Sequence, residues 1–583
     1  MASFVGLAYQ GFNWSAKILM RLLYAGKSSK LKSSLEVAGI RMYPEAYLSV
    51  VGFLLTVSIA IATPVVWFTG LLFIEAAPLI LLLLAYALPS IKARDRAAKL
   101  DMEVPFMAAY ISVMATGGLS PYVSMSRLKG CELLPHTSKA VKQMELDVQL
   151  KGLDPVAAIE KLAEHAPSKE YREFLLGYVH SLRTGGDVVH YLLTRTEAMF
   201  RDLAAKLRAF GDRAAMLLES YIAITILSTL GISIVFITSI GFQKYWGGGF
   251  TAGDFLLYSY ILIPVLSILF IYLSDLSNFQ EPVYETTPYK VFAATSPLLI
   301  LLLLVMFLPY ILLGLTLLPI TKQFADFLIL VRSKLGLERG YEPSLGLGIA
   351  LIVSTIPAAV AHSYYNRKRG RSIINAVANF LRDMTETRKT GASPESCIIQ
   401  LSARHYGSFS RYLKIAARQL KWGQPFRVIY ETLRKRISSW FALINLYLLV
   451  DAIEVGGGSP ETLETMARFG EMQSSLEKER VAALRPLMVM PYIGSVIMVF
   501  STIICVNFMH SAIYSISRQA VPYTQLITTI VPPLILQSYL TGIVAGKISA
   551  GSVSAGFKHA IILTVITLAL IVLMPHFHKT FVW

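Results

Sequence analysis

The sequence predicts an all-α, polytopic helical membrane protein with about nine transmembrane helices and two cytoplasmic six-helix bundles. Composition is the first reason, because 54% of the 583 residues are apolar and only 16% are charged. The second reason is that apolar runs of about 18 residues or more recur along the chain, and each can cross about 30 Å of hydrocarbon. The third is that the two long polar stretches between these runs match each other in order. In lipid, only a helix satisfies its own backbone hydrogen bonds without closing a barrel, so we expect every span to be helical.

The apolar runs divide the chain into spans and polar regions. We expect spans at 47–68, 71–89, 218–241, 254–273, 292–313, 344–362, 487–508, 524–545 and 558–575. The predicted segments are a cytoplasmic or interfacial amphipathic region (1–46), a transmembrane hairpin (47–89), cytoplasmic module 1 (90–217), four transmembrane helices (218–363), cytoplasmic module 2 (364–486) and three C-terminal transmembrane helices (487–583).

The N-terminal region carries apolar residues at helical spacing, among them Trp14 and Ile18, with Lys17 and Arg21 nearby. We expect no signal peptide before the first span. Two interpretations stay open for this region. It is either a helix that lies on the inner membrane surface and is attracted to anionic lipid, or a helix packed on the rest of the protein.

The formal net charge of +17 is concentrated beside the spans. One example is the cluster Arg367, Lys368, Arg369 and Arg371, which follows the predicted span 344–362. Lysine and arginine accumulate in cytoplasmic loops, so the distribution predicts that the N-terminus and both modules face the cytoplasm and that the C-terminus lies outside. Membrane topology thus accounts for the charge, and we expect no nucleic-acid partner.

Three landmarks of module 1 recur in module 2 at a spacing of about 270–273 residues. In each module a helix ends in a turn that contains glycine, serine and proline, a second turn with glycine and proline follows, and a glycine-rich turn precedes the last helix. The matched segments are 116–121 with 390–394, 151–155 with 422–425, and 183–187 with 454–459. Collinear landmarks at a fixed period predict an internal duplication.

The same landmarks predict how each module folds. Ser120, Asp154, Ser393 and Ser459 each stand directly before a proline. This pairing predicts a helix N-cap followed by proline at the first helical position. The nearby glycines favour the left-handed residue that ends the preceding helix. Each module is therefore predicted to be a bundle of about six helices joined by tight turns.

The last helix of each module is predicted to continue into the next span. No proline or polar break appears between Val188 and Ile240, and only Pro486 and Pro491 interrupt the corresponding segment after Glu461. A helix of about 50 residues measures about 75 Å. Such a helix would connect a cytoplasmic bundle directly to the membrane.

This order of features resembles the inner-membrane platform family of type II secretion systems, which includes platform proteins of type IV pili and of the archaellum. The resemblance rests on the turns described above, on their duplication and on their attachment to spans, over about two thirds of the chain. Two modules in one chain resemble the archaeal members of the family. The resemblance does not distinguish an archaellum from an adhesive or DNA-uptake pilus.

The resemblance implies the core platform of an archaeal type IV pilus-like machine in the cytoplasmic membrane. Such a platform docks a hexameric secretion ATPase and couples its movement to the extraction of pilin-like filament subunits. The expected partners are therefore the ATPase, the pilin-like subunits and membrane lipid. From the symmetry preference of oligomers we also expect a homodimer.

The turns and one basic cluster are the candidate partner-binding residues under this resemblance. The alternative interpretation is that they are only helix caps and solvated faces. The candidates are Gly118, Pro121, Gly185, Gly186, Asp187, Gly391, Pro394, Arg434, Lys435, Arg436, Gly456, Gly457 and Gly458.

The sequence predicts no catalytic chemistry. Segment 542–548 has one residue too few between its glycines for a phosphate-binding loop and lacks Ser or Thr after Lys547. Asp187 and Asp254 both lack the first glycine of the Gly-x-Gly-Asp element of an aspartyl prepilin peptidase. His576 and His578 have no further metal-ligand residue nearby in sequence. We therefore expect no enzymatic activity, no cofactor and no metal site.

A secondary transporter is the alternative function, because internal repeats are typical of that class. Transport pathways usually place polar and ionisable groups at membrane depth. Within the predicted spans such groups are scarce, and Glu75 is the clear case. A transporter also does not require two sizeable soluble bundles, so we prefer the platform.

The turns before the long helices provide the first test. We expect the double substitution Gly185→Pro with Gly186→Pro, or Gly457→Pro with Gly458→Pro, to abolish filaments while the protein still inserts into the membrane. Proline would break the backbone at the base of the helices that are expected to transmit movement. Electron microscopy of filaments, with a blot of the membrane fraction, measures both effects. Normal filaments in these variants would contradict a mechanical role for the turns.

Overall fold

Helices form every regular element in the part of the chain that the computed structural model describes. The described residues are 12, 14–21, 31–32, 35, 38, 40, 42–69, 76–241, 250–277, 286–311, 319–369, 371–456, 458–517 and 522–581. The predicted all-α class is therefore confirmed. The chain divides into two compact units, which are described separately below. Unit 1 contains Met1–Phe200, Leu381–Cys397 and Ile444–Phe469, and unit 2 contains Arg201–Phe380, Ile398–Leu443 and Gly470–Trp583.

Seven helical segments among the described residues are long and apolar enough to cross a membrane. Their positions agree with the last seven predicted spans. They are Val188–Gly241 (α9), Ala252–Asp275 (α11, η2 and α12), Thr287–Tyr310 (α13 and α14), Glu342–Tyr365 (in α16), Pro460–Ile513 (α22, η5 and α23), Tyr523–Ala550 (α24) and Val553–Leu573 (in α25).

The first two predicted spans, 47–68 and 71–89, stay predictions. They fall largely in α3 (Pro44–Thr69) and at the start of α4 (Ala76–Thr116), of which only Pro44–Ala60 is identified as an apolar helix, shorter than a span. Glu75, the ionisable residue predicted in this hairpin, lies outside the described residues.

The N-terminal residues of unit 1 pack on the hairpin formed by α3 and α4. Ala16 and Leu19 are buried in a cluster with residues of α3 and α4, and the Tyr47 hydroxyl donates to the Ala85 carbonyl at 2.7 Å. Trp14 and Ile18 are exposed, so the predicted apolar face is not the face that contacts the protein. The helix therefore packs on the hairpin and also leaves apolar side chains exposed, which is compatible with lipid contact.

Module 1 consists of α4 and five further helices. These are α5 (Pro121–Arg127), α6 (Pro135–Lys151), α7 (Pro155–Glu164), α8 (Lys169–Arg183) and α9 (Val188–Gly241). In unit 1, α4 packs against α5, α6 and α8, and α7 packs against α6 and α8. The apolar stripe of α4 is fully buried there, with Val104, Met107 and Ile111 each at most 1% exposed.

Module 2 contains helices in the same order. They are α17 (Arg371–Lys389), α18 (Pro394–Leu401), α19 (Ser410–Lys421), α20 (Phe426–Arg434), α21 (Trp440–Gly456) and α22 (Pro460–Leu484), with the short η4 (Gly407–Phe409) before α19. A 3₁₀ turn, η5 (Pro486–Met488), separates α22 from α23 (Met490–Ser517), where the sequence predicts an interruption at Pro486. By contrast, α9 is one continuous helix, as predicted.

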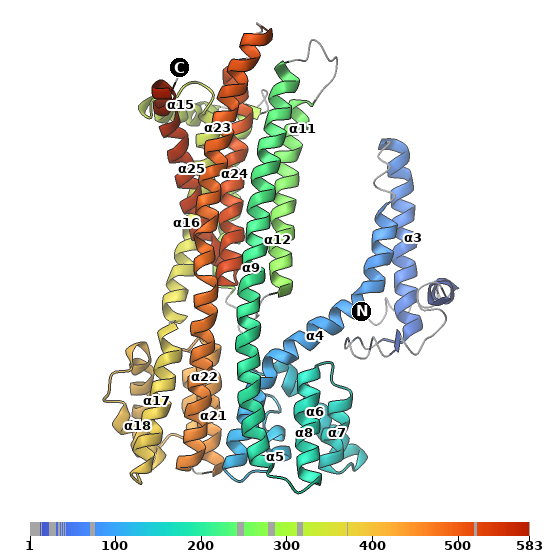
Figure 1. Ribbon diagram of the computed structural model, residues 1–583, viewed down its shortest axis with the longest axis vertical. Helices are drawn as coiled ribbons and strands as arrows, with labels where there is room; N and C mark the ends of the chain where they lie inside the picture. The colour runs from blue at the N-terminus through green and yellow to red at the C-terminus, as the bar shows by residue number, and fades with distance from the viewer. Residues whose placement is uncertain are drawn as a thin grey trace. The chain divides into compact units, whose positions relative to one another are not determined.

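The membrane-spanning part of unit 2 is arranged around α24. Figure 1 shows α16, α23, α24 and α25 side by side, and α24 packs against the other three and against α12 (Ile263–Ser277). In its apolar window, 72% of α24 is buried, compared with 11% of the span that begins with α13 (Thr287–Met306). Helix α24 is thus the central helix, while α13 exposes most of its apolar surface.

The two long helices meet in unit 2 through equivalent residues. A Cβ added to Gly211, Gly494 or Gly241 would lie 2.6–2.8 Å from Ala483, Ile222 or Ile513, respectively. Within each pair the residue numbers differ by 272, as do those of the ion pair between Lys547 and Asp275 (2.6 Å). Contact between equivalent residues of two copies is the mark of a two-fold axis. These contacts support the predicted duplication and locate an internal pseudo-two-fold axis along the two long helices.

We expect Gly494→Val to destabilise the protein, because its side chain would clash with Ile222. Overpacking of this kind typically costs about 1–3 kcal/mol. Gly231→Val in α9 is the matched control, since a Cβ there meets no atom within 4 Å. Thermal unfolding of the detergent-solubilised protein should show a lower Tm for Gly494→Val and little change for Gly231→Val. Adding Ile222→Ala to Gly494→Val should restore part of the loss, and no recovery would argue against this contact.

Candidate functional site

The glycines of the predicted turns have matching backbone conformations in the two modules. Each adopts the left-handed region that residues with a side chain rarely occupy, which confirms the role predicted for them. The pairs are Gly118 (φ 86°) with Gly391 (88°), Gly152 (63°) with Gly423 (71°), and Gly185 (69°) with Gly458 (59°).

The four predicted N-caps, Ser120, Asp154, Ser393 and Ser459, are also confirmed, and Asp187 caps α9 in the same way. In each case a side-chain oxygen accepts from a backbone N–H at the start of the following helix, where N–H groups have no partner within the helix. The acceptors are Ser120 for α5, Asp154 for α7, Asp187 for α9, Ser393 for α18 and Ser459 for α22. Pro121 and Pro394 each occupy the first position of their helix.

Two predicted turns of module 2 are joined by Arg388. Its Nε donates to the Gly458 carbonyl (2.9 Å) and its Nη1 to the Ala392 carbonyl (2.6 Å). Pro394 Cγ lies 3.5 Å from the position of a Cβ at Gly458. The turn that contains Gly391 therefore packs on the turn before α22, and one arginine contacts both.

The first turn of module 1 lies at the start of α22. A Cβ on Gly117, next to Gly118, would lie 3.5 Å from Thr462 Oγ1, two residues after Pro460. Nearby, Lys389 Nζ lies 3.2 Å from Glu464 Oε2. Unit 1 thus brings turns of both modules to the base of one long helix. We call this region, together with the polar contacts of α21 described below, the module junction.

The other predicted residues have different surroundings. The amides of Gly185 and Gly186 donate to the carbonyls of Leu182 and Ser181 at the end of α8, which is local helix capping. Gly456 ends α21, and Gly457 lies outside the described residues. Arg434 ends α20, with Lys435 and Arg436 directly after it; all three belong to unit 2.

A buried carboxylate links the two modules at the junction. Asp451 on α21 is 1% exposed; it accepts a hydrogen bond from the Tyr110 hydroxyl of α4 and lies 3.1 Å from Arg127 Nη1 at the end of α5. Tyr447, one turn earlier on α21, stacks on Tyr110 with ring centroids 6.0 Å apart. Its hydroxyl donates to the Arg127 carbonyl at 3.4 Å.

These contacts explain how an acid is accommodated in an apolar helix. A buried carboxylate is costly unless it is paired and hydrogen-bonded, and here a phenol and a guanidinium supply both. Burial, and then the neighbouring Asp451 carboxylate, raise the pKa of Tyr110 far above its ordinary value. The phenol therefore keeps its proton and remains a donor at physiological pH.

Tyr110, Arg127 and Asp451 are not among the residues predicted from the sequence. The available signal was Asp451 itself, an acid directly after the uncharged and mostly apolar stretch 440–450 of α21. A helix that is apolar on all sides is buried on all sides. Tyr110 and Arg127 lie more than 300 residues earlier, and nothing in the sequence pattern connects them to Asp451.

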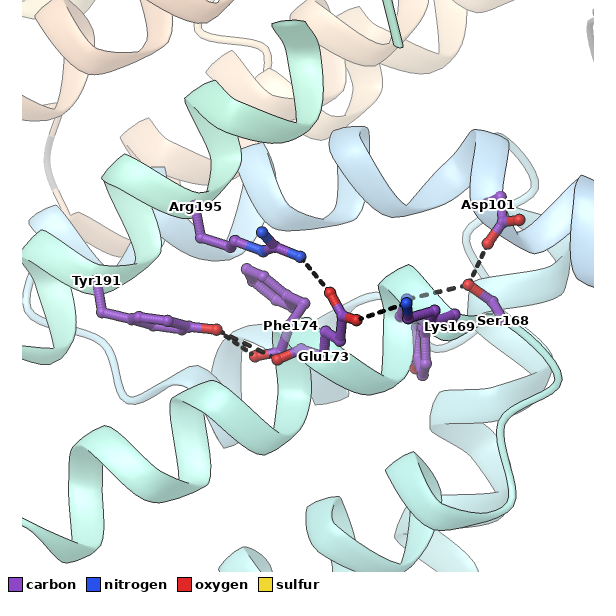
Figure 2. Close-up of polar contacts among 8 residues, drawn as sticks. Asp101, Ser168, Lys169, Glu173, Phe174, Tyr191 and Arg195 are labelled. Carbon is purple, nitrogen blue, oxygen red and sulfur yellow. Dashed lines mark hydrogen bonds and ion pairs between the residues drawn. The ribbon is translucent and has the colours of Figure 1, made fainter. Parts of the chain in front are cut away.

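The first turns of α9 are fixed to α8 by a second set of polar contacts, shown in Figure 2. Arg195 of α9 pairs with Glu173 of α8 at 2.7 Å, and the Tyr191 hydroxyl donates to the Phe174 carbonyl at 3.2 Å. Ser168, the N-cap of α8, in turn donates to Asp101 of α4. The base of α9 is thereby held by the bundle from which it emerges.

The junction is suited to positioning helices rather than to bond chemistry. Its polar groups form hydrogen bonds or ion pairs with helix N-termini, with backbone carbonyls and with one another. Across the described residues, no group of three or more His, Cys, Asp or Glu side chains is placed to hold a metal ion.

Comparison with known proteins identifies a family domain in module 2. Residues 380–506 match the family model of type II secretion system protein F. The match begins in α17, continues through the helices of module 2 and ends in α23. The chain therefore carries a platform domain of this family, and the predicted resemblance is confirmed over that segment. For module 1 the resemblance stays a prediction.

The chain also has a distant archaeal relative. It is 19% identical over 507 residues to the uncharacterized protein MJ1286 of Methanocaldococcus jannaschii. The alignment covers 84% of this chain and 82% of that protein. No solved structure matches the chain.

We expect Asp451→Ala to destabilise the module junction, because it leaves the buried Tyr110 hydroxyl without an acceptor. A buried polar group without its partner costs about 1–3 kcal/mol. Glu454→Ala, at an exposed position one turn later on α21, is the matched control and should change little. Chemical denaturation followed by far-UV circular dichroism compares the two.

A double-mutant cycle measures the interaction free energy between Asp451 and Tyr110. Tyr110→Phe removes the orphaned hydroxyl, so the double variant Asp451→Ala with Tyr110→Phe should lose less stability than the sum of the single variants. Strict additivity would show that the two side chains are not coupled.

Proposed function

We propose that this chain is the inner-membrane core platform of an archaeal type IV pilus-like filament machine. It docks a hexameric secretion ATPase on its cytoplasmic modules and couples movement of the ATPase to the extraction of pilin-like subunits and filament assembly. The observation that carries the proposal is the match of residues 380–506 to type II secretion system protein F, a segment that runs from the helices of module 2 into a helix apolar enough to span a membrane. The archaeal setting rests on the relative from Methanocaldococcus jannaschii.

The long helices support a mechanical role. Val188–Gly241 and Pro460–Ile513 each contain 54 residues, and each begins at a glycine turn and ends in an apolar span. The uninterrupted α9 measures about 80 Å, and the second segment has one 3₁₀ turn at Pro486–Met488. An element of this kind can carry a displacement from a bundle to the membrane, which a flexible linker cannot do.

Close packing of the two helices supports joint movement. Gly211 with Ala483, and Gly494 with Ile222, bring the helices into contact at equivalent heights. Packed side chains at such contacts do not deform continuously, because protein interiors are as dense as organic crystals. Displacement of one helix is therefore transmitted to the other, and two modules in one chain act as a pair. In the proposed homodimer, two such pairs would present four modules to the ATPase.

The proposed placement in the cytoplasmic membrane follows the charge distribution. The N-terminus and both modules face the cytoplasm, where a secretion ATPase has access to ATP, and the C-terminus lies outside. Basic residues at the end of α16 and the start of α17 (Arg367, Lys368, Arg369 and Arg371) support this orientation, since lysine and arginine concentrate on the cytoplasmic side.

The deciding experiment is a tagged pull-down from detergent-solubilised native membranes, followed by mass spectrometry. We expect the secretion ATPase and small pilin-like proteins to be recovered with the chain, and the identity of the pilin names the filament. An unrelated multi-pass protein with the same tag is the control. Recovery of neither partner, together with a rise in Tm on adding a small solute, would favour a secondary transporter instead.

A further inference from the structure

A basic surface lies on the hairpin formed by α19 and α20, which we call the basic hairpin (residues 410–436). Arg411, Lys414, Arg418 and Lys421 are all exposed. Their spacing places them on one face of α19, because residues three and four positions apart are neighbours on a helix surface. Exposed Arg427, Lys435 and Arg436 add further positive charge from α20 and the residues after it.

A tryptophan projects from the tip of this hairpin. Trp422 follows the last residue of α19 and is 77% exposed, beside Gly423, whose left-handed backbone makes the tight turn. Tryptophan and arginine are the residue types most enriched among interface residues that dominate binding energy. A large exposed indole beside a row of basic side chains therefore has the composition of a protein-binding surface.

The fold does not require this charge. The corresponding hairpin of module 1, α6 and α7, has the same left-handed glycine and exposes Leu150 to the same 77%. From the start of α6 to the end of α7 (135–164), the module 1 hairpin has four Lys or Arg and five Asp or Glu. From the start of α19 to the end of α20 (410–434), the module 2 hairpin has six Lys or Arg and one Glu. Two hairpins of the same architecture thus differ in sign of charge, and only that of module 2 is strongly basic.

Membrane topology accounts for the basic residues beside the spans, but it does not account for the charge of the basic hairpin. The positive-inside rule acts within about 15–20 residues of the span ends. Helix α19 begins at Ser410 and α20 ends at Arg434, whereas the preceding apolar span ends at Tyr365 and the next is predicted to begin at residue 487. The basic hairpin lies well beyond that reach on both sides.

The surface is not built to lie in a lipid bilayer. An interfacial helix inserts a continuous apolar face between the head groups. Here the apolar face of α19 is buried within the protein through Leu413, Ala416 and Ala417, and that of α20 through Ile429 and Leu433. Besides its basic side chains, the hairpin exposes Trp422, Val428 and Glu431, which do not form a continuous apolar face.

We propose that the basic hairpin is a docking surface for an acidic protein surface that has an apolar pocket for Trp422. On the proposed function, on which this identification rests, that partner is the secretion ATPase. The two modules then have different roles, because module 2 supplies the electrostatic contact and module 1, with its balanced charge, does not.

The test is binding of the purified secretion ATPase of the same organism to the full chain in nanodiscs, measured by biolayer interferometry. Trp422→Ala should weaken binding by about 30-fold, the loss typical of a dominant interface residue. Lys421→Glu should weaken it by about tenfold, and the loss should shrink as salt is raised, because salt screens charge interactions. The matched controls Leu150→Ala and Lys142→Glu, at exposed positions of the module 1 hairpin, should leave the affinity within about twofold of wild type. Unchanged gel-filtration profiles and Tm values show that each variant is folded.

The outcomes separate the two proposals. If the wild-type chain does not bind the ATPase, the proposed function is wrong and this docking surface falls with it. If the wild type binds and Trp422→Ala and Lys421→Glu bind equally well, only the docking surface is wrong.

A lipid role is tested with an environment-sensitive dye on Trp422→Cys, using the parent chain as labelling control. A change in its emission between phosphatidylcholine and phosphatidylglycerol nanodiscs without ATPase would overturn the proposal in favour of anionic lipid.

Discussion

The close approach of the two long helices is the constraint on which the membrane part of the structure depends. At each of three contacts between equivalent residues, one side is glycine: Gly211 meets Ala483, Gly494 meets Ile222 and Gly241 meets Ile513. In a symmetric dimer of separate chains, both sides of an on-axis contact must be the same residue. Duplication within one chain removes that requirement, so a large side chain can fill the space that glycine leaves.

Interhelical hydrogen bonds complement these apolar contacts. Tyr221 pairs with Ser267 at 3.0 Å, the Thr229 hydroxyl donates to Gln537 Oε1 at 2.8 Å, and Ser495 pairs with Ser538 at 2.9 Å. In lipid there is little hydrophobic drive for helices to associate, so packing of small residues and polar contacts supply the affinity. These side chains connect α9, α12, α23 and α24, and they specify which helices are neighbours.

Local features of the fold were predictable from sequence, and long-range ones were not. Caps such as Ser120 and left-handed glycines such as Gly391 follow from residue types within a few positions, and so does the continuity of α9. The contact of Asp451 with Tyr110 joins distant parts of the chain, and the exposure of Trp14 depends on which helix face the hairpin covers. Nothing in the sequence distinguishes Gly494 from other glycines in apolar runs, because its role depends on contact with the distant Ile222.

The 3₁₀ turn at Pro486–Met488 gives the two long helices different mechanical properties. Helix α9 has no such interruption, and its residues Ala214 and Leu218 lie in one buried cluster with Leu484 and Leu487, on either side of Pro486. The interruption between α22 and α23 is therefore packed against a continuous part of α9, which supports it. Bending at Pro486 requires that α22 and α23 first separate from α9 there, so opening of the pair and bending of one member are a single cooperative event rather than two independent motions.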